Sequence, residues 1–256
     1  LAFDAQGSID TALRLKETID RENVLIKVPG TAEGVEAFEE LTARGVNVNV
    51  TLLFAVERYR EIAEAYVRGL RKRVDAGESV ERAASVASFF VSRVDTKVDA
   101  ALEKLGREDL RGKAAVANAR VAYAVFQEIF SGEEWERLAK AGAAVQRPLW
   151  ASTSTKNPDY PDTLYVDELI GPDTVNTMPD ATIEASRDHA TPARTVDRDV
   201  DGAQALIDEL KQIGVPFDEI VSRELVDEGV ASFAESYESL LSTLESKASE
   251  LSAAAR

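Results

Sequence analysis

The sequence contains no cysteine among its 256 residues and only one histidine, His189. The lack of cysteine excludes thiol nucleophiles, thiolate metal sites and a disulfide scaffold. Cations are also scarce, because 30 Lys and Arg residues oppose 46 Asp and Glu residues and leave a net charge of −16. A surface this acidic repels nucleic acid and anionic membranes, so we expect neither as a partner. An anionic ligand would need a locally placed cation.

The chain also lacks a signal-peptide pattern and any apolar run long enough to span a bilayer, which predicts a soluble, cytoplasmic protein. The sequence has no G-x-G-x-x-G turn and no Walker-type loop, which argues against a nucleotide-binding doubly wound fold. Hydrophobic residues make up 45% of the chain, which is enough for a folded core. The first residue is Leu1 rather than Met, so we expect that the sequence is not a whole protein.

Helical segments alternate with short apolar, β-branched segments, which predicts a parallel sheet with helical crossovers. We expect one domain over residues 1–256, with a helix-rich region at 180–256. Its amphipathic tail is expected to pack across the other helices; closing over the site or a dimer contact is the alternative. Strands are predicted at residues 24–28, 46–54, 86–91, 145–151 and 174–178. The main helices are predicted at residues 8–20, 33–44 (with Thr31 as N-cap), 56–74, 94–105, 110–130, 200–213 and 217–251, the last broken near Gly229.

The second predicted strand carries polar residues where a helix-covered parallel strand is usually apolar throughout. In Val-Asn-Val-Asn-Val-Thr-Leu, at residues 46–52, the side chains of Asn47, Asn49 and Thr51 share one face. A solvated face is the common explanation of such alternation. Here a helix must cover the other face, so the polar row points to water, a partner or a barrel interior. Barrel enzymes place their chemistry near such a polar row.

Lys27 interrupts the apolar strand Val-Leu-Ile-Lys-Val at residues 24–28. A strand lysine commonly extends its amine to solvent. Alternatively, an apolar cavity would disfavour the ammonium form, and the neutral amine could attack a carbonyl and form a Schiff base. Composition alone leaves both readings open.

Two cations follow other strands and lie beside hydroxyl-rich turns. Arg93 follows Ser-Phe-Phe-Val-Ser at residues 88–92, and Lys156 follows Ser-Thr-Ser-Thr at residues 152–155. Each alone is commonly surface charge, but together in so acidic a chain they make an anion site plausible.

The ordered set of these segments resembles the transaldolase family. Leu-Ile-Lys-Val-Pro-Gly-Thr at residues 25–31, followed by Glu33-Gly34, resembles the Schiff-base strand of that family. The next two family strands are matched by residues 45–54 and 85–95, and the end of the barrel in longer bacterial members by residues 150–157 and 162–179. The resemblance covers most of residues 1–180.

The resemblance implies a (β/α)8 TIM barrel and transfer of a dihydroxyacetone unit in the pentose phosphate pathway. The donor would be sedoheptulose 7-phosphate and the acceptor glyceraldehyde 3-phosphate, giving erythrose 4-phosphate and fructose 6-phosphate. Lys27 matches the Schiff-base lysine and Asn49 the asparagine beside it. Thr51 matches the threonine that helps hold the catalytic water. No metal or organic cofactor is implied, and a homodimer is one alternative for the assembly.

The resemblance also implies a set of substrate-binding residues. Ser88 lies where a serine lines the substrate site, Arg93 matches a phosphate-binding arginine, and Ser154 matches a serine near the same group. Lys156 falls where many members carry a second phosphate-binding arginine. Because lysine lacks the guanidinium fork, we expect a different grip on the phosphate at this position.

The family has three barrel strands before the lysine strand, carrying an Asp, an Asn and an acid–base Glu. We expect that these three strands are absent from this chain, and that the chain alone has little or no transaldolase activity. Two other functions remain open: a class I aldolase that releases free product, and a non-catalytic fragment that binds sugar phosphate.

Overall fold

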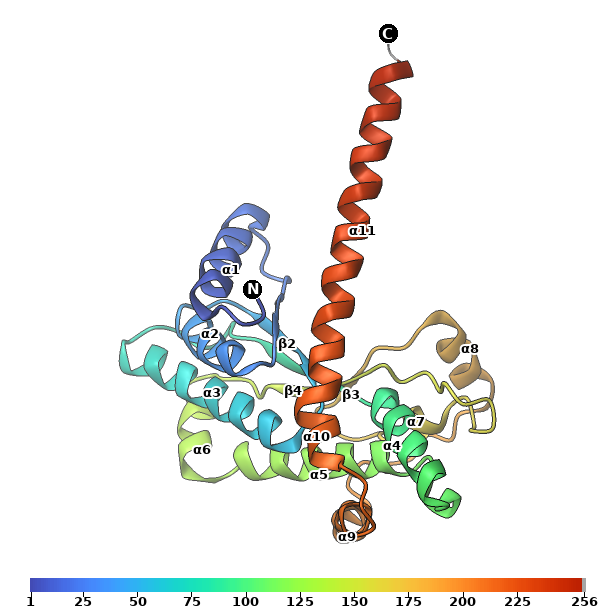
Figure 1. Cartoon of the computed structure of the whole chain (residues 1–256). Coiled ribbons are helices and arrows are strands. Elements are labelled where there is room, and N and C mark those ends of the chain that lie inside the picture. Colours follow the sequence, from blue (N-terminus) through green and yellow to red (C-terminus); the bar gives the residue numbers. More distant parts are fainter. Residues whose placement is uncertain (255–256) are drawn as a thin grey trace.

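The computed structural model describes residues 1–254, and it contains one parallel sheet with helices packed on it (Figure 1). The strands follow one another in chain order across the sheet, and every neighbouring pair is parallel. This confirms the predicted α/β class and the predicted number of strands. The strands are β1 (Ile26–Pro29), β2 (Val48–Leu53), β3 (Ser85–Phe90), β4 (Arg147–Ala151) and β5 (Val175–Asn176).

The helices connect the strands and then fill the C-terminal part of the chain. The predicted N-cap is confirmed, since the Thr31 hydroxyl accepts a hydrogen bond from the Gly34 amide at 3.1 Å. The short helix at residues 132–140 is not among the predicted helices. The helices are α1 (Ala5–Ile19), α2 (Ala32–Ala43), α3 (Val56–Asp75), α4 (Ser92–Leu105), α5 (Ala114–Ile129), α6 (Gly132–Lys140), α7 (Leu164–Asp167), α8 (Asp180–His189), α9 (Val200–Gln212), α10 (Phe217–Glu219) and α11 (Leu225–Ala254).

The sheet is open within residues 1–254, because β1 pairs only with β2 and β5 pairs only with β4. A parallel sheet whose strands follow in chain order, each connected by helices, is the arrangement found in a (β/α)8 barrel. The described strands do not close into a ring. The outer edge of β1 therefore has no neighbouring strand among the described residues.

The core lies between the sheet and α2, α3 and α5. Val48 and Val50 of β2 are fully buried on the side that faces these helices, and Ile26 and Val28 continue this apolar face on β1. Aromatic rings fill the space between the helices, with the Phe38 and Tyr66 rings stacked at 6.0 Å. Burial of these side chains supplies most of the driving force for folding.

The predicted break of the last helix near Gly229 is wrong, because α11 runs without interruption from Leu225 to Ala254. The irregular turn lies earlier, as a π-helical turn at residues 220–224. A Cβ atom on Gly229 would lie 2.7 Å from the Cδ2 atom of Leu52, so this glycine permits close packing of α11 on β2. Glycine here serves the contact between the helix and the sheet rather than a bend.

The tail also does not pack across the other helices as expected. Figure 1 shows α11 leaving the body as a single long rod with the C-terminus at its far end. Burial ends near Val230, and residues 231–251 are exposed. The large apolar side chains exposed on this rod are Phe233, Tyr237, Leu240, Leu241, Leu244 and Leu251. None of the helices in residues 1–254 is long and apolar enough to cross a membrane.

Candidate active site

The predicted polar row lies on one face of the sheet, opposite the face that packs on the helices. Lys27 of β1 is the registered neighbour of Asn49 in β2, and Pro29 is the registered neighbour of Thr51. Registered neighbours in a parallel pair point to the same side, and residues two apart on one strand share a face. Lys27, Asn49 and Thr51 therefore project from the same face, here named the polar face.

Ser88 joins this group from β3. Val86 is registered with Asn49, so Ser88, two residues further on, also lies on the polar face. Its hydroxyl donates a hydrogen bond to Oδ1 of Asn49 at 2.7 Å. This bond occupies the carbonyl side of the Asn49 amide and fixes its orientation. The amide NH2 group remains as the donor that the side chain can offer to a ligand beside Lys27.

The surroundings of Lys27 differ from the apolar cavity considered above. Ile26 and Val28 on either side of it are buried, whereas Lys27 itself is exposed. The exposure follows from the open sheet, because β1 has a strand on one side only within residues 1–254. Thr51, one strand away, is 7% exposed.

Arg93 lies in the first turn of α4, directly after the end of β3. Its guanidinium carbon lies 5.1 Å from the centre of the Phe90 ring, a cation–π contact that holds the head group at this end of the sheet. Among residues 1–251, no carboxylate forms an ion pair with it. An unpaired arginine at the N-terminal end of a helix is suited to bind an anion.

Ser154 and Lys156 lie together in the loop that follows β4. The Lys156 ammonium donates to the Ser154 hydroxyl at 2.7 Å. This loop contacts the start of α4, because the hydroxyls of Ser92 and Ser152 are 2.9 Å apart and the Ser92 amide donates to the Ser152 carbonyl at 3.1 Å. The structure brings Ser154 and Lys156 together, but it shows no contact between Lys156 and Arg93 within the described side chains.

Two sets of polar contacts near the site involve residues that the sequence pattern does not single out. Thr153, fully buried, donates to Oδ1 of Asn176 at 2.7 Å and so connects the ends of β4 and β5. Asp95 and Asp99, one helical turn apart on α4, are also buried. Their only sequence signal is two acids at helical spacing immediately after Arg93, a pattern that is also common on solvated helix faces.

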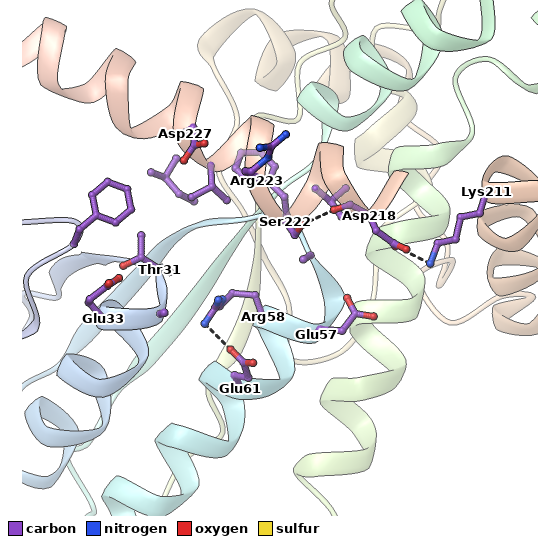
Figure 2. A pocket seen from close by; sticks show the side chains of 18 residues that line it. Thr31, Glu33, Glu57, Arg58, Glu61, Lys211, Asp218, Ser222, Arg223 and Asp227 are labelled. Carbon is purple, nitrogen blue, oxygen red and sulfur yellow. Dashed lines mark hydrogen bonds and ion pairs between the residues drawn. The ribbon is translucent and has the colours of Figure 1, made fainter. Parts of the chain in front are cut away.

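The cavity shown in Figure 2 also carries cations, but it lies elsewhere in the fold. It has a volume of about 600 Å³ and lies between the ends of β1 and β2 and the segment that begins α11. None of the predicted site residues lines it. Its cations are already paired: Arg58 with Glu61, Lys211 with Asp218 at 2.7 Å, and Arg223 with Glu219. Paired cations are poorly suited to recognise a phosphate.

His189 lies on the surface. Its side chain is 48% exposed and contacts Asp162 and Asp188, with Nε2 2.8 Å from the Asp162 carboxylate. These two carboxylates, first Asp162, raise the pKa of the imidazole. Within the described residues, no group of three or more His, Asp or Glu side chains is arranged to hold a metal ion.

Comparisons with known proteins agree on one family. Residues 1–244 match the family model described as transaldolase/fructose-6-phosphate aldolase. A protein of Thiobacillus denitrificans named transaldolase is 50% identical over 247 residues, which cover 95% of this chain and 68% of that protein. Proteins of the same name from Mycolicibacterium smegmatis and Thermobifida fusca are 47% and 48% identical, and each match covers 94% of this chain and 66% of the relative. The chain thus spans about two thirds of the length of these curated relatives.

Proposed function

The chain belongs to the transaldolase/fructose-6-phosphate aldolase family, and from this premise we propose that its polar face carries the Schiff-base chemistry of a transaldolase. The reaction proposed is transfer of a dihydroxyacetone unit from a ketose phosphate to an aldose phosphate. The observation that supports it most is the placement of Lys27 beside Asn49, whose amide is fixed by the Ser88 hydroxyl at 2.7 Å. A nucleophilic amine and an oriented amide donor then face the same ligand.

In the first half of the reaction, Nζ of neutral Lys27 adds to the C2 carbonyl of the ketose phosphate. Loss of water from the adduct gives an iminium ion, which accepts electrons from the C3–C4 bond. That bond breaks as the C4 hydroxyl loses its proton to a water molecule held near Thr51. An aldose phosphate leaves, and a three-carbon enamine remains on Lys27.

In the second half, the enamine carbon attacks the aldehyde of the acceptor aldose phosphate and a new C–C bond forms. The new alkoxide takes up the proton, and water hydrolyses the iminium to release the product and free Lys27. The Asn49 amide is placed to donate a hydrogen bond to a hydroxyl of the bound three-carbon unit. Arg93, with Ser154 and Lys156, is proposed to hold the phosphate group of the substrate.

An aldolase that releases the three-carbon product is the second candidate, because the description of the matching family includes fructose-6-phosphate aldolase. The two candidates share the chemistry up to the enamine. They differ in its fate, since a transaldolase passes the enamine to an aldehyde and an aldolase protonates it to give free dihydroxyacetone.

Product analysis separates these candidates. The chain is incubated with fructose 6-phosphate, with and without erythrose 4-phosphate as acceptor, and the products are measured by chromatography. Because little transaldolase activity is expected of this chain alone, we expect at most a small amount of sedoheptulose 7-phosphate, and only when the acceptor is present. Free dihydroxyacetone formed without the acceptor supports the aldolase. A folded chain that gives neither product, and no covalent adduct after borohydride reduction, supports a non-catalytic sugar-phosphate binder and contradicts the proposal.

The homodimer and the cytoplasmic location remain predictions. Sedimentation equilibrium of the purified chain tests the first, and cell fractionation tests the second.

A further inference from the structure

Two tyrosines from the region after β4 contact two buried carboxylates on α4. The Tyr160 hydroxyl donates to Oδ2 of Asp99 at 2.6 Å, and the Tyr165 hydroxyl donates to Oδ2 of Asp95 at 2.8 Å. Asp95 is 1% exposed and Asp99 is 7% exposed. Short hydrogen bonds to a carboxylate are stronger than those between neutral groups. These two contacts join segments that are more than 60 residues apart in the chain.

Each carboxylate also accepts a backbone hydrogen bond from the segment that leads into α5. The Gly112 amide donates to Oδ1 of Asp99 at 2.9 Å, and the Ala115 amide donates to Oδ1 of Asp95 at 2.7 Å. Asp95 and Asp99 therefore connect three parts of the fold: α4, the start of α5 and the segment after β4. Since both oxygens of each carboxylate are occupied, their orientation on α4 is fixed.

The Tyr160 ring rests on a backbone position that only glycine suits. Gly112 has a φ of +71°, and a Cβ atom there would lie 2.8 Å from Cζ of the ring. Burial, followed by the hydrogen bond to Asp99, raises the pKa of Tyr160 to about 12. The phenol therefore stays protonated, and remains a donor, throughout the physiological pH range.

The segment held in this way includes the loop with the proposed phosphate ligands. Ser154 and Lys156 lie between the end of β4 and Tyr160, and Arg93 lies in the first turn of the helix that carries both carboxylates. Lys156 and Tyr160 line a cavity of about 200 Å³ beside Asp95 and Asp99. The loop is attached at its start by the contact between Ser92 and Ser152 and further along by the tyrosines.

We propose that the Tyr160–Asp99 and Tyr165–Asp95 hydrogen bonds position the loop that carries Ser154 and Lys156 against α4, and thereby set the affinity for the phosphate group of the substrate. This inference rests on the proposed function, because that function assigns the phosphate to Arg93, Ser154 and Lys156. The tyrosines and aspartates are positioning residues that do not touch the substrate. Loosening either contact gives the loop more conformations, and ordering it again opposes phosphate binding.

The test compares Tyr160→Phe with Tyr237→Phe, which makes the same change at an exposed position on α11. Inorganic phosphate is titrated into each folded variant of the full chain by isothermal calorimetry, well below the melting temperature. We expect the dissociation constant to rise about 2- to 10-fold in Tyr160→Phe, the equivalent of one lost hydrogen bond, and to stay unchanged in Tyr237→Phe. Arg93→Gln, which removes a proposed ligand, serves as the reference for loss of the site.

A purely structural role would lower the melting temperature of Tyr160→Phe and leave its phosphate affinity unchanged, which would overturn the inference. If Tyr160→Phe does not fold, Tyr165→Phe tests the second contact by the same titration. A wild-type chain that does not bind phosphate also overturns the inference.

The same samples show whether a negative result refutes only the positioning role or also the proposed function. Borohydride trapping of fructose 6-phosphate on Lys27 reports the Schiff base, and it does not depend on the phosphate titration. If Lys27 is trapped but the phosphate affinity of Tyr160→Phe is unchanged, only the positioning role of the tyrosines is refuted. If Tyr160→Phe binds phosphate more weakly but no adduct forms on Lys27, the positioning role at a phosphate site is supported and the transaldolase chemistry is refuted.

Discussion

Replacement of Asp95 by asparagine should change how the stability of the fold depends on pH. Burial raises the pKa of the Asp95 carboxyl from 3.8 to about 6. Hydrogen bonds from the Ala115 amide and the Tyr165 hydroxyl act in the opposite direction, and the nearby Asp99 carboxylate raises the pKa further. Burial prevails because the residue is 1% exposed on the side of α4 that packs on α5.

The direction of this pH dependence follows from the number of protons bound in the folded and in the unfolded state. Between pH 3.8 and about 6 the folded chain holds the Asp95 proton while the unfolded chain has lost it, so folding is favoured at low pH. This contribution is lost as the pH rises through the folded-state pKa. A shift of about 2 pKa units corresponds to about 3 kcal/mol, of which about 1 kcal/mol is lost between pH 5 and pH 8.

The assay is urea unfolding of the wild type and of Asp95→Asn at several values between pH 5 and pH 8. Subtracting one free energy of unfolding from the other removes the contributions of carboxylates that do not interact with Asp95. From pH 5 to pH 8, the free energy of unfolding of the wild type should fall by about 1 kcal/mol relative to that of the variant. Asp109→Asn is the control: the neighbouring Arg107 lowers the pKa of Asp109 below 3.8, so its difference curve should be flat. A flat or rising curve for Asp95→Asn would refute the reasoning.

Three further predictions concern the packing and the polar face. Leu53→Ala should lower the free energy of unfolding by about 2–5 kcal/mol, because Leu53 is fully buried. Leu240→Ala, at a position 55% exposed, should change it by less than about 0.5 kcal/mol, and urea unfolding measures both. Gly112→Ala should lower the melting temperature more than Gly106→Ala: both have positive φ, but only Gly112 carries a tyrosine ring within 3 Å of the added methyl group. Equal losses would contradict that contact. Ser88→Ala should slow borohydride trapping about 2- to 10-fold, because it frees the amide that the hydroxyl orients; an unchanged rate would show that this bond is unimportant.

The sheet could be predicted from local patterns in the sequence. Short β-branched runs between amphipathic helices identified all five strands, and the alternation around Asn49 and Thr51 identified the polar face. These patterns repeat every two or every 3.6 residues, so one window of sequence is sufficient to detect them. Helix 132–140 was missed because its buried face has only two large apolar residues, Trp135 and Leu138.

The end of the chain was harder to predict. Glycine is a poor helix former, so Gly229 suggested a break. The structure instead uses its missing side chain to bring α11 close to Leu52. The apolar residues beyond Val230 follow a helical spacing that predicts a buried stripe, yet they are exposed. Amphipathic spacing shows that a face is apolar and does not show which surface covers it.

In the candidate site, too, features set by neighbouring residues could be predicted, whereas contacts between distant residues could not. The residues on β1, β2 and β3 could be placed on one face from strand periodicity and from resemblance to a family. The hydrogen bonds of Tyr160 and Tyr165 to α4 join residues far apart in the sequence, and nothing in the local pattern of either segment predicts its partner. Such contacts depend on the tertiary fold.

Identifying the lysine that forms the Schiff base tests the proposed function most directly. The chain is incubated with fructose 6-phosphate, reduced with borohydride and digested, and the modified peptide is identified by mass spectrometry. We expect a three- or six-carbon adduct on Lys27, which Lys27→Met abolishes and Lys156→Met retains. An adduct on Lys156 instead, or undiminished trapping in Lys27→Met, would contradict this expectation.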